Sequence, residues 1–232
     1  MIPLVEVFHS VQGEGTNVGS SAIFIRFGGC NLDCHFADGS VCDTPWKKPT
    51  LRMDLEDLEA QIRTFGWNRE RLTNPWIILT GGEPTAAPMF ERVVERFWSS
   101  HRIAVETNGT RWRDALNMVD HICVSPKNLP GINHGLMRVN ANPQERVLAL
   151  AKELRFVITG RHDPVPRLRP ICKDDVDLFV SPALLADGMG QEHEKEDIPE
   201  FVPGALVRCL EIVMEDPRWR LSLQTHKWAR VR

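Results

Sequence analysis

The feature of this sequence that most constrains its fold is the alternation of short β-branched or aromatic runs with stretches of helical spacing. A continuously apolar run at residues 75–80 is followed by two glycines, which is typical of a strand buried on both faces. Strands are predicted at residues 3–8, 21–27, 75–80, 102–107, 121–126, 153–158, 177–182 and 219–225, and helices at about 53–63, 90–97 and 203–214. Strands interleaved with helices predict an α/β fold with a mainly parallel sheet.

Polar residues gather where these predicted strands end. Four such clusters lie at residues 80–83, 106–109, 125–127 and 181–182. In parallel α/β sheets and barrels, the carboxyl ends of the strands form the ligand-binding rim. We therefore expect several separate segments to present their side chains to one edge of the sheet.

Composition excludes several classes of protein. The chain has 232 residues, of which 25% are charged, and its net charge of −3 gives no sign of a nucleic-acid partner. No apolar run approaches the roughly 18 residues of a membrane span, and the first ten residues lack the pattern of a signal peptide. We expect a cytoplasmic protein with reduced thiols and no membrane partner, because a chain of this length needs no disulfide framework.

Three of the six cysteines, Cys30, Cys34 and Cys42, lie close together. Thiolates bind iron–sulfur clusters and zinc. The first two are spaced as in the cluster signature C-x3-C-x2-C, but the third place is taken by Ala37. Three cysteines suit a [4Fe–4S] cluster with one open iron, whereas His35 would complete four zinc ligands, and unligated thiols are the third interpretation. The other cysteines (Cys123, Cys172 and Cys209) lie in apolar contexts and are expected in the core.

A second motif, LTGGEPT at residues 79–85, makes the cysteine cluster more informative. Two glycines after a buried strand let the backbone approach a ligand closely. The glutamate that follows them, Glu83, offers a carboxylate to an ammonium group. A strand-terminal turn of this kind about forty residues after a three-cysteine loop is a specific combination.

With these motifs the chain resembles the radical S-adenosylmethionine (SAM) superfamily and, within it, the 7-carboxy-7-deazaguanine synthase family. The resemblance is carried, in family order, by HSVQGEG (9–15), FIRFGGCNLDC (24–34), CDT (42–44), TGGEP (80–84), ETNG (106–109), VSPK (124–127), ELRFVI (153–158) and LQTHKW (223–228). It implies a shortened partial (βα) barrel forming a single domain over residues 1–232. It also implies a cluster loop at 28–44 and a C-terminal tail, at about 219–232, that caps the substrate.

The same resemblance implies an activity. A reduced [4Fe–4S] cluster would cleave SAM to a 5′-deoxyadenosyl radical, which would take hydrogen from C6 of 6-carboxy-5,6,7,8-tetrahydropterin. The pterin would contract to 7-carboxy-7-deazaguanine with loss of ammonia, and SAM would be regenerated. Such an enzyme would serve queuosine or other 7-deazapurine biosynthesis. Its implied cofactors are the cluster, SAM and Mg²⁺, and its implied partners are an electron donor such as flavodoxin or ferredoxin and a second copy in a homodimer.

The resemblance also assigns roles to individual positions. Cys42 is the better third cluster ligand, because it directly precedes Asp43 and Thr44 as the last cysteine of the family does. The cluster ligands would be Cys30, Cys34 and Cys42, with Thr44 on Mg²⁺. SAM would be bound by Asp43, Gly82, Glu83, Ser125, Pro126, Lys127, Ser181, Pro182 and Ala183. The substrate would be bound by Val11, Gln12, Gly13, Glu14, Arg26, Thr80, His226 and Arg232.

The departure from the family pattern is the spacing C-x3-C-x7-C, which we interpret as an insertion over residues 35–41. Two other functions are left open. A glycyl-radical-enzyme activase shares the cluster, SAM and the Gly-Gly-Glu-Pro turn, although HSVQGEG and LQTHKW are evidence against it. A zinc-binding structural or interaction protein would use Cys30, Cys34, His35 and Cys42. Glu106 and Asn108 are expected only to shape a turn near SAM.

Overall fold

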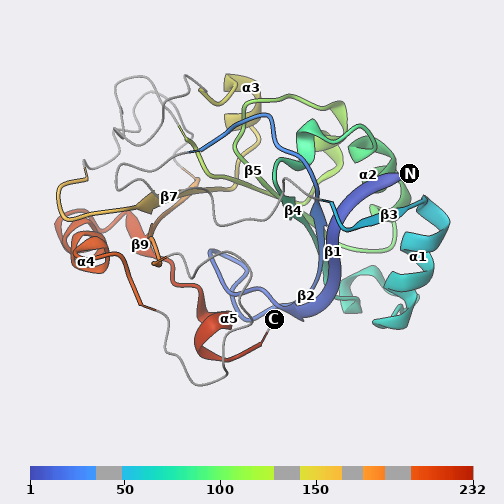
Figure 1. Cartoon of the computed structure of the whole chain (residues 1–232), viewed down its shortest axis with the longest axis horizontal. Coiled ribbons are helices and arrows are strands. Elements are labelled where there is room, and N and C mark those ends of the chain that lie inside the picture. Colours follow the sequence, from blue (N-terminus) through green and yellow to red (C-terminus); the bar gives the residue numbers. More distant parts are fainter. Residues whose placement is uncertain (35–48, 128–141, 164–174, 186–199, 232) are drawn as a thin grey trace.

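The computed structural model describes residues 1–34, 49–127, 142–163, 175–185 and 200–231. Nine strands form one curved sheet in the order β3-β1-β2-β4-β5-β6-β7-β8-β9 (Figure 1). Their bounds are β1 Ile2–Val11, β2 Ser21–Phe27, β3 Leu51–Met53, β4 Trp76–Gly81, β5 Ile103–Thr107, β6 His121–Val124, β7 Glu153–Ile158, β8 Asp177–Pro182 and β9 Trp219–Leu221. From β2 to β9 neighbouring strands are parallel, whereas β1 is antiparallel to both β2 and β3. In the described part of the chain the sheet does not close, which confirms the predicted partial barrel.

In the described ranges, helices or 3-10 turns lie in five of the connections between strands: β3–β4, β4–β5, β5–β6, β6–β7 and β8–β9. The helices are α1 Leu55–Thr64, α2 Phe90–Phe97, α3 Glu145–Leu148, α4 Ala205–Glu215 and α5 Thr225–Trp228, with 3-10 turns η1 Arg71–Thr73, η2 Pro84–Ala86 and η3 Asp114–Met118. Helix α1 begins as predicted, because the Asp54 carboxylate accepts the backbone N–H of Asp57 at 2.9 Å and so caps the first turn.

The two faces of the sheet differ in chemistry. Successive side chains of a strand point to opposite faces. On the outer face, residues such as Ile25 and Leu79 join α1, α2 and α4 in the main hydrophobic core. The inner face holds a small apolar cluster that includes Phe24 and Ile78. Two residues further along each of β2, β4 and β5, the same face carries polar residues: Arg26, Thr80 and Glu106. The fold thus places polar groups inside the barrel near the carboxyl ends of its strands.

The C-terminal segment differs from its predicted structure. A strand was predicted at 219–225, but β9 ends at Leu221 and the chain turns into α5. The reason is a change of partner: the Ser222 N–H still donates to Val180 O at 2.9 Å, whereas the Thr225 N–H donates to Gly13 O at 3.0 Å. The tail therefore leaves the sheet and packs on the loop after β1.

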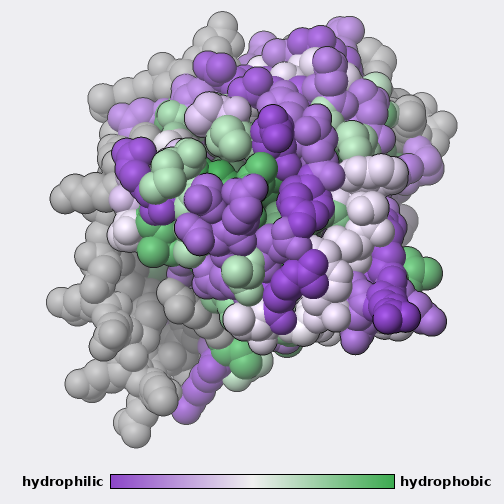
Figure 2. Space-filling view, turned by 90° about the vertical axis from the view of Figure 1, so that its right-hand side faces the viewer, coloured by the Kyte–Doolittle hydropathy of each residue, from purple (hydrophilic) through white to green (hydrophobic). Residues whose placement is uncertain are grey.

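The outer surface over α1 and α2 is polar, as expected where helices bury their apolar residues against the sheet. Figure 2 shows the face that carries α1 and α2, and this face is mainly hydrophilic, with apolar residues scattered across it. Both helices turn their apolar residues, such as Ile62 and Phe90, into the core. None of the helices in the described ranges has the length and apolar character needed to cross a membrane.

Candidate active site

The predicted cluster loop starts where β2 ends. Cys30 is partly exposed and Cys34 is buried. The Leu32 N–H donates to the sulfur of Cys30 at 3.4 Å. The other predicted members of the loop site (Cys42, Asp43 and Thr44) lie outside the described residues. Their roles at the cluster, SAM and Mg²⁺ stay predictions.

A cavity of about 320 Å³ lies beside Cys30. It is lined by Gly28, Gly29, Cys30, Asn31, Ala86, Ala87, Pro88 and Arg111. Within the described ranges no three ligating side chains come together as a complete metal site. Two cysteines on one short loop, with small residues leaving space beside one of them, nevertheless fit an iron–sulfur cluster whose third ligand comes from elsewhere.

The TGGEP turn is bound directly to this loop. Gly82 N–H donates to Phe27 O at 3.1 Å, and Glu83 N–H donates to Gly29 O at 3.0 Å. Gly81 has a φ of +121°, and a Cβ at this position would lie 2.3 Å from the carbonyl oxygen of Phe27. The sequence predicted that these glycines allow close approach to a ligand. In the structure, Gly81 allows close approach of the end of β4 to the end of β2.

The side chain of Glu83 connects two motifs. It is 1% exposed, and Oε1 accepts hydrogen bonds from Thr85 N (3.0 Å), Thr85 Oγ1 (2.6 Å) and Thr107 Oγ1 (2.7 Å). Oε2 accepts the Asn108 N–H at 2.7 Å. Burial raises the pKa of Glu83, although these hydrogen bonds oppose the rise. The carboxylate therefore joins the TGGEP turn to the ETNG turn, and its predicted contact with SAM stays a prediction.

A chain of amide and hydroxyl groups joins the cysteine loop to the same ETNG turn. Asn31 Nδ2 donates to Thr110 Oγ1 at 2.8 Å, and Asn108 Nδ2 donates to Asn31 Oδ1 at 3.2 Å. The sequence analysis did not single out Asn31. Its position between two predicted ligands, within GGCNLDC, was the available signal.

The remaining predicted SAM residues lie at the carboxyl ends of β6 and β8, as the topology requires. Ser125 N–H donates to Thr107 O at 2.8 Å, and Lys127 Nζ donates to Ser125 Oγ at 3.0 Å. The second group (Ser181, Pro182 and Ala183) ends β8, and the Ala183 N–H donates to Ile158 O at 2.8 Å. Their contacts with SAM stay predictions, but both groups follow strands that run parallel in the same sheet.

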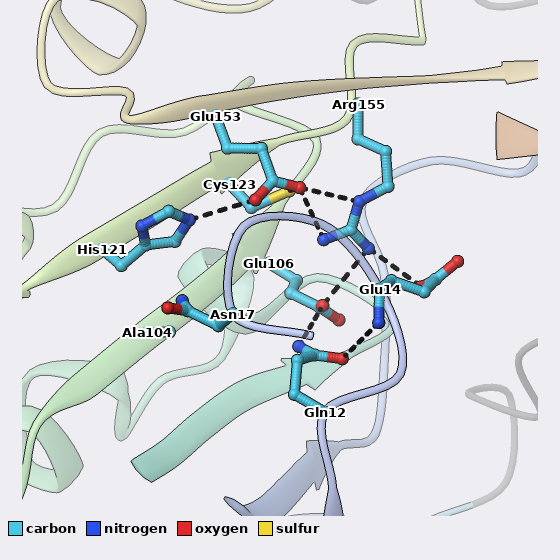
Figure 3. Close-up of a pocket in the computed structure, with 9 residues that line it drawn as sticks. All are labelled: Gln12, Glu14, Asn17, Ala104, Glu106, His121, Cys123, Glu153 and Arg155. Atoms are coloured by element: carbon cyan, nitrogen blue, oxygen red, sulfur yellow. Dashed lines mark hydrogen bonds and ion pairs between the residues drawn. The ribbon is translucent and has the colours of Figure 1, made fainter. Parts of the chain in front are cut away.

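Inside the barrel, three predicted substrate residues belong to one hydrogen-bonded group, and Figure 3 shows two of them, Gln12 and Glu14, together with Glu106. Gln12 Nε2 donates to Glu106 Oε1 at 3.2 Å, Thr80 Oγ1 donates to Glu106 Oε2 at 2.8 Å, and the Glu14 N–H donates to Gln12 Oε1 at 3.2 Å. Glu106 stands at the centre of this group, although the sequence analysis gave it only a turn. The signal was its place in β5, two residues after the inward-facing Ala104.

Arg26, predicted to bind the substrate carboxylate, is paired within the protein. Its Nε donates to Glu6 Oε1 at 2.8 Å across the antiparallel β1–β2 pair. Both side chains are about a quarter exposed (24% and 23%), so the guanidinium remains accessible to a further anion. Its role in substrate binding stays a prediction.

The C-terminal tail packs on the predicted substrate loop. Thr225 donates to Gly13 O through both its N–H (3.0 Å) and its hydroxyl (2.9 Å), and the imidazole of His226 lies directly against Gly13. Burial lowers the pKa of His226, with a further contribution from Lys227 and Arg26 that Glu106 opposes. Figure 1 shows this loop, in blue, beside α5. Val11 is more exposed than these residues, and Arg232 lies outside the described residues.

Comparison with known proteins finds relatives along the whole chain. Residues 24–162 match the Radical SAM superfamily. The chain is 32% identical to the 7-carboxy-7-deazaguanine synthase of Haemophilus influenzae over 97% of this chain and 91% of the relative. It is 30% identical to that of Bacteroides thetaiotaomicron over 98% and 97%. The crystal structure of QueE from Escherichia coli shares its fold, with a TM-score of 0.63, 24% identity and coverage of 96% and 93%.

Proposed function

The chain belongs to the 7-carboxy-7-deazaguanine synthase family of the radical SAM superfamily, and we propose on this basis that it converts 6-carboxy-5,6,7,8-tetrahydropterin to 7-carboxy-7-deazaguanine. It is a radical SAM ring-contracting lyase of 7-deazapurine biosynthesis. The observation that carries the substrate proposal is one hydrogen-bonded group inside the barrel, in which Gln12 and Thr80 donate to Glu106 and the Glu14 N–H donates to Gln12. Relatives that span the chain favour a synthase over an activase or a zinc-binding protein.

The loop and the rim hold the cofactors in this proposal. Cys30, Cys34 and Cys42 ligate a [4Fe–4S] cluster, and the strand-end groups at residues 82–83, 125–127 and 181–183 bind SAM together with Asp43. The cluster and SAM supply the radical chemistry when bound. The chain's own contribution is positional: hydrogen bonds from Gly82 and Glu83 hold the cysteine loop against the rim.

Polar groups inside the barrel recognise the pterin. Its planar edge presents N–H donors, which the carboxylates of Glu14 and Glu106 and the carboxamide of Gln12 can accept. Arg26 pairs with the substrate carboxylate, for which its planar fork is suited. A Mg²⁺ ion on Thr44 would share that carboxylate, since magnesium readily takes substrate oxygens as ligands.

The tail keeps water away from the reacting atoms. Thr225 and His226 fasten α5 to Gly13, and Arg232 follows at the chain terminus. Exclusion of water protects a reactive intermediate from side reactions. The lowered pKa of His226 keeps its imidazole neutral near pH 7.

Three further parts of the proposal concern the surroundings of the enzyme. An electron donor such as flavodoxin or ferredoxin reaches the cluster from the side of the partly exposed Cys30. The protein forms a homodimer, which sedimentation velocity would measure. Support comes from the exposed apolar residues of α4 (Val207, Leu210 and Met214). Among the described residues, the buried cysteines Cys123 and Cys209 form no disulfide, which agrees with a cytoplasmic location.

Anaerobic reconstitution tests this function directly. The wild-type protein should become brown, bleach with dithionite, and convert the pterin to 7-carboxy-7-deazaguanine, identified by mass spectrometry. Cys42→Ala should lose the cluster and the activity, while the matched core variant Cys209→Ala should retain both. A wild-type protein that cleaves SAM but leaves the pterin unchanged would refute the substrate proposal. Full activity in Cys42→Ala would refute the assignment of the third ligand.

A further inference from the structure

One guanidinium inside the barrel contacts three carboxylates that come from three separate segments. Arg155 Nη1 lies 2.9 Å from Glu14 Oε2 and 3.4 Å from Glu106 Oε1. Its Nε and Nη2 lie 2.8 and 2.7 Å from Glu153 Oε1. The side chain is 9% exposed, and Figure 3 shows it between the loop after β1 and the ends of β5 and β7. The resemblance gave neither Arg155 nor Glu153 a role.

Glu153 anchors both this guanidinium and the substrate loop. It is 1% exposed, and its Oε2 accepts the Thr16 N–H at 3.0 Å and lies 3.2 Å from His121 Nε2. Gly15 has a φ of +67°, and a Cβ there would lie 2.2 Å from Glu153 Oε1, so only glycine lets the loop lie this close. Burial alone would raise the pKa of Glu153, but the His121 contact and the Arg155 charge hold it well below its ordinary value.

Among the described residues of this cluster, the single positive charge of Arg155 is outnumbered by the negative charges of the carboxylates that it contacts. One guanidinium faces the carboxylates of Glu14, Glu106 and Glu153, and the cavity between them, about 10 Å³, has room for about one water molecule. Carboxylates this close would repel one another and take up protons without a shared cation. The planar guanidinium of arginine can bind Glu153 through two nitrogens and still offer Nη1 to the carboxylates of Glu14 and Glu106. The single ammonium group of a lysine cannot make all of these contacts at once.

We propose that Arg155 is a positioning residue of the substrate site, anchored by Glu153, which holds the carboxylates of Glu14 and Glu106 in place for the N–H edge of the pterin's aminopyrimidinone ring. The inference rests on the proposed function and deepens it. Other titratable groups also face the cluster or adjoin it: His121 and Cys123 on β6, Asp177 through Thr16, and His226 with Arg26 beside Glu106.

Arg155→Lys tests the inference, because the substitution keeps a positive charge beside the carboxylates and should leave the protein folded. Losing one charge-assisted contact should raise KM and the Kd for the pterin by about 10- to 100-fold. The kcat value and SAM cleavage without substrate should stay near wild type. The acid limb of kcat/KM should move to higher pH, since the carboxylates then take up protons more readily. Arg155→Met should shift it further if that variant folds.

The matched control is Arg218→Lys. Arg218 grips Asp216 two residues away with Nε and Nη2, as Arg155 grips Glu153, but the pair is at the surface. This variant should leave KM, Kd and the pH profile unchanged. An Arg155→Lys enzyme that melts at a lower temperature with unchanged KM and pH profile would overturn the positioning role. A wild-type enzyme that neither binds nor turns over the pterin would overturn the proposed function itself, and this inference with it.

Discussion

Gly81 lets the end of β4 lie against the end of β2 because it has no Cβ. Its backbone is in the left-handed half of conformational space, and a Cβ would meet the carbonyl of Phe27, on the strand that leads to Cys30. Gly81→Ala should therefore lower the free energy of unfolding by about 3 kcal/mol or more, through backbone strain plus a steric clash. Gly66→Ala, with a φ of +106° but nothing near its Cβ, should cost only the strain, about 1–2 kcal/mol. Urea unfolding of both variants measures this difference, and equal losses would contradict the clash.

Glu83 and Glu106 make hydrogen bonds within the protein that their sequence context did not predict. Glu83 lies in the more specific motif, yet its carboxylate is buried against donors of the protein. Glu106, which was expected to shape a turn, accepts hydrogen bonds from Gln12 and Thr80. The sequence shows that each carboxylate lies near the carboxyl end of a predicted strand. The residue that forms a hydrogen bond with it can be 94 positions away in the chain. The rim could therefore be predicted, whereas the hydrogen bonds inside the barrel could not.

At the level of elements, the critical contact is between the loop after β1 and α5. A methyl group on Gly13 would lie within 2.0 Å of His226 Nδ1 and 2.9 Å of the His226 backbone nitrogen. Gly13→Ala should therefore displace α5 and increase tryptic cleavage after Lys227 and Arg230 several-fold, because local opening governs proteolysis. Gly160→Ala, where a Cβ would meet no atom and the φ is not positive, is the control and should be cleaved like the wild type. Equal cleavage of both variants would show that α5 is held by other contacts.

Elements with several turns or alternations were predictable, and the shortest were not. The sequence predicts β2 with its observed ends because it is a short, nearly continuous apolar run, and α2 because its apolar residues repeat at a period of 3.6. The missed elements, β3, α3 and α5, have three or four residues each, too few for any period to appear. They form because tertiary partners select them. For α5 the partner is Gly13, at the opposite end of the chain.

For the whole molecule, one buried histidine makes stability depend on pH. His101 packs edge-on against Trp67 and Phe97, and within the described part of the chain its Nε2 has no hydrogen-bond partner. Burial, together with the charges of Arg71 and Arg63, lowers its pKa from 6.5 to about 4. The unfolded chain thus binds a proton that the folded protein rejects, so stability is lost as the pH falls from 6.5 toward 4, by roughly 3 kcal/mol.

His101→Phe should remove this part of the acid sensitivity while retaining the aromatic packing. Urea unfolding at pH 7 and pH 4.5 measures the effect, with the exposed His162→Phe as control. Glu153, whose pKa is held below its ordinary 4.5, adds a separate loss that begins only below about that pH. Acid sensitivity in His101→Phe equal to that of the wild type would contradict the assignment.

The segment that carries the cysteines starts and finishes on the same strand. At its start the Gly28 N–H donates to Pro3 O at 3.0 Å, and at its finish β3 pairs with β1 through Leu4 and Leu51. Because these two anchor points lie close together on β1, the length of chain between them has little effect on stability. Doubling the length of a loop costs only about 0.6 kcal/mol. Natural selection or a protein engineer can therefore lengthen, shorten or replace the predicted insertion at residues 35–41 while the sheet and its polar interior keep their places.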